Sequence, residues 1–214
     1  MKKIILGICL TAASLFMTVS AFAAYGAPAA FSPIQFSVWP GVANWPNVES
    51  VDGLRLGIYN HSEEGFGYPL NGVDLGLLSG SSDVNGVQLS VANLGGQNID
   101  GVQLAWLNMN ENGGSLQLGA YNILKSSEGV QFGLANLNDR NNWAAQFAVI
   151  NYTDPKSDGF QVGVINAADR YDGFQLGLLN INSDNSANKG FQIGLINWMD
   201  NGFFPLFPFF NFSK

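Results

Sequence analysis

The octet GFQLGLLN, residues 173–180, recurs in close copies along most of the chain. A short, nearly constant period indicates many copies of one strand-and-turn unit, so this repeat determines how the sequence folds. Residues within a copy are numbered below from its first residue, which is position one. Ten copies, spaced 14 to 19 residues apart, begin at Gly53, Gly72, Gly86, Gly101, Ser115, Gly129, Ala144, Gly159, Gly173 and Gly190.

Each octet alternates apolar side chains with polar or small ones. In the copy at 173, positions two, four and six are Phe174, Leu176 and Leu178, while position five is Gly177. Alternation over this length is typical of a β-strand whose two faces differ. We therefore expect the apolar positions to form the core and Gly177 to let neighbouring strands approach.

Amide side chains occupy two further positions of the repeat. Position three is Gln in eight of the ten octets, and position eight is Asn in nine. If successive coils stack in parallel, equivalent residues lie about 4.8 Å apart, and a column of amides can donate and accept along itself. We predict a structural ladder made of Gln88, Gln103, Gln117, Gln131, Gln146, Gln161, Gln175, Gln192, Asn93, Asn108, Asn122, Asn136, Asn151, Asn166, Asn180 and Asn197.

The fold class predicted from this pattern is all-β, a β-solenoid of about ten coils of 14–15 residues with aromatic and proline-containing caps. An antiparallel meander and a β-barrel are the alternatives. A meander would place equivalent amides at opposite ends of neighbouring strands, so their repetition would gain nothing. In a membrane barrel, three outward residues would cover roughly 15 Å, which is short of the apolar band of about 25 Å.

The chain divides into four parts. Residues 1–23 have Lys2 and Lys3, a long apolar run and an Ala-x-Ala ending, which together are typical of a signal peptide. Residues 24–52 are expected to form an N-terminal cap and first strand, with the strand in SPIQFSVW at 32–39. Residues 53–201 are the repeat domain. Residues 202–214, rich in phenylalanine, are expected to cap the stack, with an outer-membrane sorting signal as the alternative.

Composition limits the partners. Removal of residues 1–23 would take away the only cysteine and two of the nine basic residues but none of the 16 acidic ones, leaving a formal charge of −9. Nucleic acid is an unsuitable partner for so acidic a chain, because phosphate binding needs clustered Lys and Arg. We expect a surface or envelope partner, and the composition also allows membrane association.

The ordered set of octets resembles a bacterial surface-repeat protein family with serial GxQxGLxN units. The resemblance also covers the opening SPIQFSVWPG, the units LRLGIYN and NGVDLGLLS, and the ending NGFFPLFPFFNF. It implies an exported protein of the cell envelope, in the outer membrane, at the surface or in the periplasm, and it brings no catalytic residue or substrate. Arg55 and Asp74 replace Gln, and Ser79 replaces Asn, so the first coils depart from the pattern.

Groups suited to catalysis are scarce. His61 is the only histidine and shares a loop with adjacent acids, which gives neither zinc spacing nor a nucleophile. The turn aspartates lack a calcium-loop pattern, and the tryptophans occupy unequal positions, which favours packing over a carbohydrate platform. We therefore predict no catalytic, cofactor-binding or metal-binding residue. The expected function is that of a non-enzymatic envelope repeat protein with a structural or interaction role, and a pore-like outer-membrane barrel is the alternative.

Overall fold

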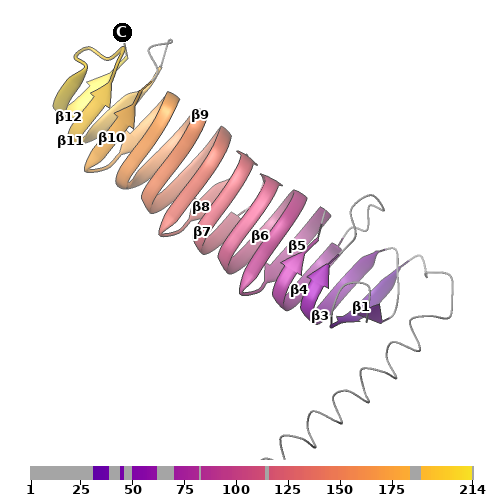
Figure 1. The fold of residues 1–214 in the computed structure, drawn as a ribbon. Coiled ribbons are helices and arrows are strands. Elements are labelled where there is room, and N and C mark those ends of the chain that lie inside the picture. Colours follow the sequence, from indigo (N-terminus) through magenta and orange to yellow (C-terminus); the bar gives the residue numbers. More distant parts are fainter. Residues whose placement is uncertain are drawn as a thin grey trace, which may run out of the picture.

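The computed structural model describes residues 31–38, 44–45, 50–61, 70–81, 83–113, 116–183 and 189–213. The predicted signal peptide lies outside the described residues, as do most of the segment 24–52, the side chain of His61 and the acids that follow it. The described part is a straight rod of stacked coils, with the first strands at one end and the last at the other (Figure 1).

All regular structure in the described residues is β. The strands are β1 (Ser32–Ser37), β2 (Asn44–Trp45), β3 (Val51–His61), β4 (Leu70–Gly80), β5 (Asp83–Leu89), β6 (Ala92–Gly113), β7 (Leu116–Ser127), β8 (Val130–Phe132), β9 (Ala135–Leu176), β10 (Leu179–Asn182), β11 (Phe191–Met199) and β12 (Leu206–Phe212). Among these residues, no helix has the length and apolar character needed to cross a membrane.

Successive coils pair in parallel and in register. Gln103 lies opposite Gln117, and Asn108 lies opposite Asn122, so each octet sits on the equivalent octet of the preceding coil. The same in-register pairing joins β3 to β4 and β4 to β5. The predicted β-solenoid is thus confirmed, with about nine turns. Parallel neighbours are incompatible with the antiparallel meander and with the barrel.

Backbone pairing continues around the corners of the coil, which is why β9 runs unbroken for 42 residues. The backbone is also paired at the corner between β8 and β9, where the Leu134 N–H donates to the Ala120 carbonyl at 2.9 Å and the Leu134 carbonyl accepts from the Ile150 N–H at 3.0 Å. The preceding Gly133 N–H donates to the Phe147 carbonyl. Stacking therefore satisfies the backbone at this corner as well as along the flat sides of the coil.

The strand faces are reversed relative to the sequence prediction. Gln175 and Asn180 are fully buried, whereas Leu176 and Leu178 are exposed on the outside of the rod. The expectation that positions two, four and six form the core is therefore wrong. The interior consists largely of amides, and the apolar side chains coat the exterior.

Position five explains this reversal. A Cβ added to Gly177 would lie 2.6 Å from Asn166 Nδ2 and 3.0 Å from Asn180 Oδ1, so this residue points into the Asn column. The inside of this tight corner has room only for a small residue: position five is Gly in seven octets, Ala in two (Ala105 and Ala148) and Ser in one (Ser90). Because side chains alternate along a strand, the glycine at position five turns position three inward and positions four and six outward.

Position one is also restricted to small residues. At Gly101 the φ angle is +152°, and an added Cβ would lie 1.9 Å from the carbonyl oxygen of Gly86 in the preceding coil. Positive φ and close backbone approach both favour glycine. The Asn-Gly and Asp-Gly pairs of the sequence thus mark the point where each coil enters its octet.

Both ends of the stack depart from the parallel pattern. β1 pairs in parallel with β3 and places Gln35 opposite Arg55, while β2 pairs antiparallel to β1. At the other end, β12 pairs antiparallel to β11, with Asn211 opposite Gln192. An antiparallel strand does not present the in-register amides that a further coil would need, so each end interrupts the repeat.

Candidate interaction surface

The Gln column runs through the interior from Gln88 to Gln192. All eight members predicted from the sequence are buried. Each Nε2 after the first donates to the Oε1 of the preceding coil's glutamine, over distances of 2.6 to 3.1 Å. Such a chain supplies each interior amide with a partner from the neighbouring coil and holds the coils in register.

The Asn column runs beside it with the opposite polarity. Each asparagine from Asn93 to Asn180 donates its Nδ2 to the Oδ1 of the next coil's asparagine, at 2.8 to 3.0 Å. Several also donate to a backbone carbonyl, as Asn166 does to Leu176 at 3.0 Å. The amide dipoles of the two columns thus point in opposite directions along the rod.

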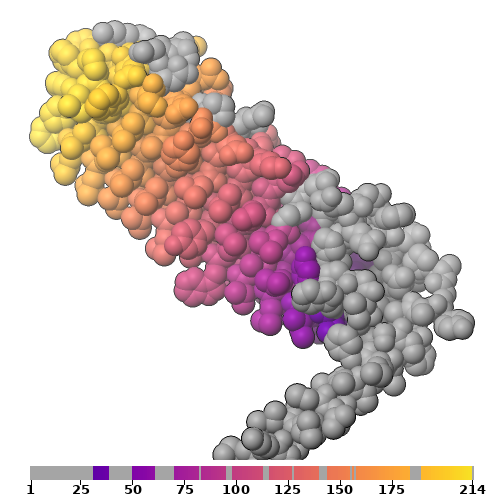
Figure 2. Space-filling view, viewed as in Figure 1, coloured from indigo at the N-terminus to yellow at the C-terminus, as the bar shows by residue number. Residues whose placement is uncertain are grey.

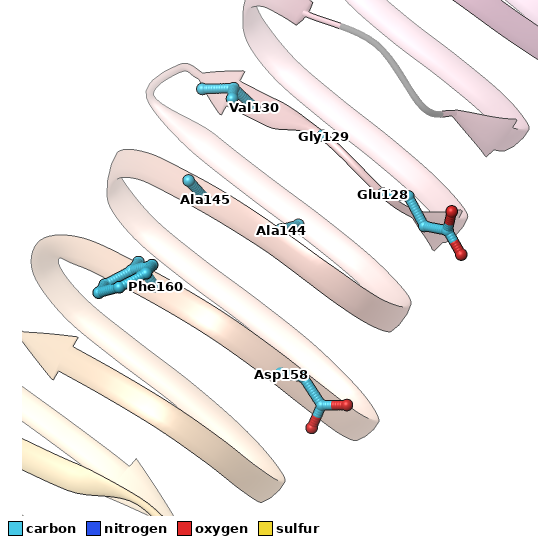
Figure 3. A pocket seen from close by; sticks show the side chains of 7 residues that line it. All are labelled: Glu128, Gly129, Val130, Ala144, Ala145, Asp158 and Phe160. Carbon is cyan, nitrogen blue, oxygen red and sulfur yellow. The ribbon is translucent and has the colours of Figure 1, made fainter.

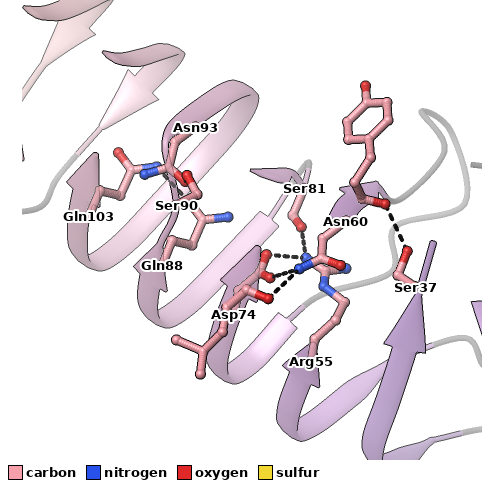
Figure 4. Close-up of polar contacts among 11 residues, drawn as sticks. Ser37, Arg55, Asn60, Asp74, Ser81, Gln88, Ser90, Asn93 and Gln103 are labelled. Atoms are coloured by element: carbon pink, nitrogen blue, oxygen red, sulfur yellow. Dashed lines mark hydrogen bonds and ion pairs between the residues drawn. The ribbon is translucent and has the colours of Figure 1, made fainter. Parts of the chain in front are cut away.

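An ion pair replaces the amides in the first coils. Arg55 and Asp74 stand in register with Gln88 and are joined at 2.7 Å, both almost completely buried. Asn60 and Ser81 are hydrogen-bonded to this pair (Figure 4). The two departures from the Gln pattern are therefore complementary, because each charge neutralises the other inside the rod.

Other interior positions hold a smaller apolar cluster. Val51, Leu70, Val84 and Ile99, each two residues before an octet, pack together at the N-terminal end of the rod. In a later coil the same position holds Tyr171, whose hydroxyl lies 2.8 Å from the Gly159 carbonyl oxygen. Burial raises the pKa of the Tyr171 phenol far above its usual range. The apolar core thus lies beside the amide columns and away from the octet's own apolar positions.

The exterior is apolar over most of the coil. Positions two and four cover one face of the rod, and positions seven and nine cover the other. The corner between the faces carries position six, which we call the apolar edge: Ile58, Leu77, Val91, Trp106, Ala120, Leu134, Val149, Val164, Leu178 and Leu195. Nine of these ten side chains are exposed, from 41% for Val164 to 71% for Trp106. Monomeric soluble proteins rarely expose so long an apolar surface, and such surfaces mark interaction sites.

Charged and polar side chains gather at the opposite corner, half a coil away. We call this the polar edge; it consists of the residue just before each octet and the third residue after it. The third residues after successive octets include Glu111, Lys125, Asp139, Asp154 and Asp169. A hydrogen bond with Asp169, together with desolvation and repulsion from the same group, raises the pKa of Asp154. No group of three or more potential metal ligands occurs among the described residues.

A shallow notch of about 610 Å³ lies on one face between the two edges. It forms where Ala144 and Ala145 leave space between the larger Val130 and Phe160 of the neighbouring coils (Figure 3). Glu128 and Asp158 stand at its polar side, and Asp158 is already paired with Lys156 at 2.9 Å. The notch is thus a local gap in the apolar face.

The exterior is the feature that sequence reasoning missed. The sequence pattern predicted the ladder residues but assigned the octet's apolar residues to the core. It also favoured packing for the tryptophans, whereas Trp106 and Trp198 are exposed on the outside. Gly177 and its equivalents carry the signal that would have corrected both expectations, because a corner glycine indicates which strand face turns inward.

Comparisons of the chain with protein-family models, with curated protein sequences and with solved structures returned no match. The geometry itself defines the class of protein: a parallel β-solenoid with paired Gln and Asn columns inside and apolar faces outside. On the face seen in Figure 2, the coils from the magenta part of the chain to the yellow C-terminal end follow one another along the rod without a break.

Proposed function

We propose that the chain is an exported, non-enzymatic protein of the bacterial envelope that acts as a structural or interaction module through its outer surface. The observation that supports this most strongly is the exterior. The octets present apolar side chains to the outside, while the interior is filled by other residues, chiefly the Gln and Asn columns. Residues such as Leu134 and Leu178 contribute little to the interior, so their recurrence is best explained by contact with something outside the rod.

The design suits a scaffold better than a catalyst. The amide columns hold the coils in fixed register, and the surface that repeats is built from aliphatic and aromatic groups instead of ionisable ones. Catalysis would need acids, bases or nucleophiles that converge on one point. Repetition along a rod of about 4.8 Å per coil, or roughly 45 Å for the octets, offers a partner many equivalent contacts.

Export is supported by residues 1–23 and by the resemblance to surface-repeat proteins. Cell fractionation combined with N-terminal sequencing tests it. We expect the accumulated protein to be in the envelope and to begin at Ala24. Recovery in the cytoplasm with residues 1–23 retained would overturn the proposal.

A further inference from the structure

Resting on the proposed envelope function, we propose that the apolar edge and the parts of both faces next to it dock into the surface of a lipid bilayer. The rod lies parallel to the membrane plane, with the polar edge in water. Because the chain has 16 acidic residues against nine basic ones, the lipid surface that fits it has zwitterionic head groups instead of anionic ones.

The extent of the apolar surface favours lipid over a second copy of the chain. A second rod would cover one flat face and leave the corner and the other face in water. On this rod, however, the corner is the most consistently exposed apolar part, and both faces adjoining it are apolar. A fluid hydrocarbon layer can surround the corner and contact both faces together, as it contacts the apolar face of an interfacial helix.

The backbone at this corner is already suited to a water-free environment. Gly177 N–H donates to the Ile193 carbonyl at 3.0 Å, and Leu178 N–H donates to the Val164 carbonyl at 3.0 Å. The Leu178 carbonyl accepts from Ile196 N–H at 2.9 Å. Since unsatisfied backbone groups are costly in hydrocarbon, a corner that inserts must have such bonds. At this corner, the same bonds leave no free strand edge at which a peptide partner could add a strand.

Side-chain size varies along the apolar edge without disturbing its character. Ala120 is followed by Leu134, and Trp106 precedes them. A rigid protein partner would need complementary pockets for each of these shapes. Lipid chains adapt to side chains of different size, so apolar character alone is sufficient.

Aromatic residues with a polar group stand where the apolar faces meet the polar edge. Trp198 is 47% exposed and donates its Nε1–H to Asp200 Oδ1 at 2.6 Å. Tyr152, at the same position of another coil, is 41% exposed and stands two residues before Asp154. Tryptophan and tyrosine prefer this boundary in membrane-bound proteins, because one end of the ring is apolar and the other is wet.

The first test compares two dye-labelled variants of the protein purified in the form that cells accumulate. Both variants also carry Cys9→Ser, so that the introduced cysteine is the only one in the chain. Leu134→Cys carries an environment-sensitive dye on the apolar edge, and Asp139→Cys carries it on the polar edge of the same coil. With phosphatidylcholine vesicles we expect a blue shift of the dye at position 134 and none at 139. Equal shifts at both positions, or none at either, would overturn the proposed orientation.

The second test measures co-flotation with the same vesicles. Leu134→Glu combined with Leu178→Glu should reduce the bound fraction at least tenfold, because two carboxylates would have to enter the apolar layer. Ser183→Glu combined with Asp139→Glu, on the polar edge, should leave it unchanged. Circular dichroism should show the same β-structure in all variants, since these side chains point outward.

Failure of lipid docking can be told apart from failure of the proposed function. If the protein fractionates with the envelope but does not float with vesicles, the envelope role stands and the lipid proposal is overturned. If the dye at position 134 instead shifts with rising protein concentration in the absence of vesicles, the occupant of the apolar edge is a second copy of the chain.

Discussion

Replacing Asn166 with alanine tests the reversed interior directly. Asn166 donates to Asn180 Oδ1 at 2.8 Å and accepts from Asn151 Nδ2 at 2.8 Å. Its removal leaves the Asn180 oxygen buried without its side-chain donor, while Asn151 keeps a bond to the Val162 carbonyl at 3.1 Å. One orphaned acceptor and the lost hydrogen bonds together should cost about 2–3 kcal/mol.

The matched control is Leu178→Ala. If Leu178 belonged to a conventional core, its truncation would cost about 2–5 kcal/mol. Because Leu178 is 53% exposed on the apolar edge, we expect a cost within about 0.5 kcal/mol. The asparagine in the same octet should therefore matter more than the leucine.

Urea denaturation followed by circular dichroism measures both variants. With a denaturant slope of about 2–3 kcal/mol per molar, Asn166→Ala should lower the midpoint by roughly 1 M, and Leu178→Ala should leave it nearly unchanged. A larger loss for Leu178→Ala than for Asn166→Ala would show that the amides face outward and would refute the assignment of the interior.

Three further predictions follow from the interior and the polar edge. Arg55→Gln and Asp74→Gln should each lower the free energy of unfolding by about 3–5 kcal/mol, because each leaves the other charge buried without its partner. The double variant should recover most of this loss by extending the Gln column, and chemical denaturation of all three variants measures the recovery. Asp154→Asn should raise the thermal midpoint at neutral pH, because it removes a carboxylate that lies beside Asp169. The raised pKa of Asp154 means that the folded protein binds this proton more tightly than the unfolded chain, so wild-type stability should increase as the pH falls toward the ordinary aspartate pKa of 3.8. Thermal scans at several pH values should show that the variant lacks this increase. Gly101→Ala should destabilise the fold by about 1–3 kcal/mol in the same scans, whereas Ala144→Gly, at the equivalent position, should change it by less.

Much of the fold could be predicted from the octet alone. The nearly constant period and the repeated amides indicate parallel stacking, since only that arrangement brings Gln103 next to Gln117 and Asn108 next to Asn122. The same register places Arg55, position three of the first octet, beside Asp74, position three of the second, so opposite charges at these two positions are the sequence signal of the ion pair.

The candidate surface was harder to predict, because alternation along a strand identifies two faces without saying which is inside. Hydrophobicity assigns Phe174, Leu176 and Leu178 to the core. The structure assigns the interior to Gln175, since the small residue Gly177 lies inside the corner and Gln175 lies on the same face of the strand.

The sequence by itself therefore determined the β-strands, the length of the coil and the partners of each amide, because local alternation and a fixed period are written in the order of the residues. Only the tertiary structure decided which face is inside. The corner of a coil of 14 or 15 residues has room only for Gly, Ala or Ser at position five. Closing the coil turns the amides inward, where stacking satisfies them, and leaves the apolar residues on the surface.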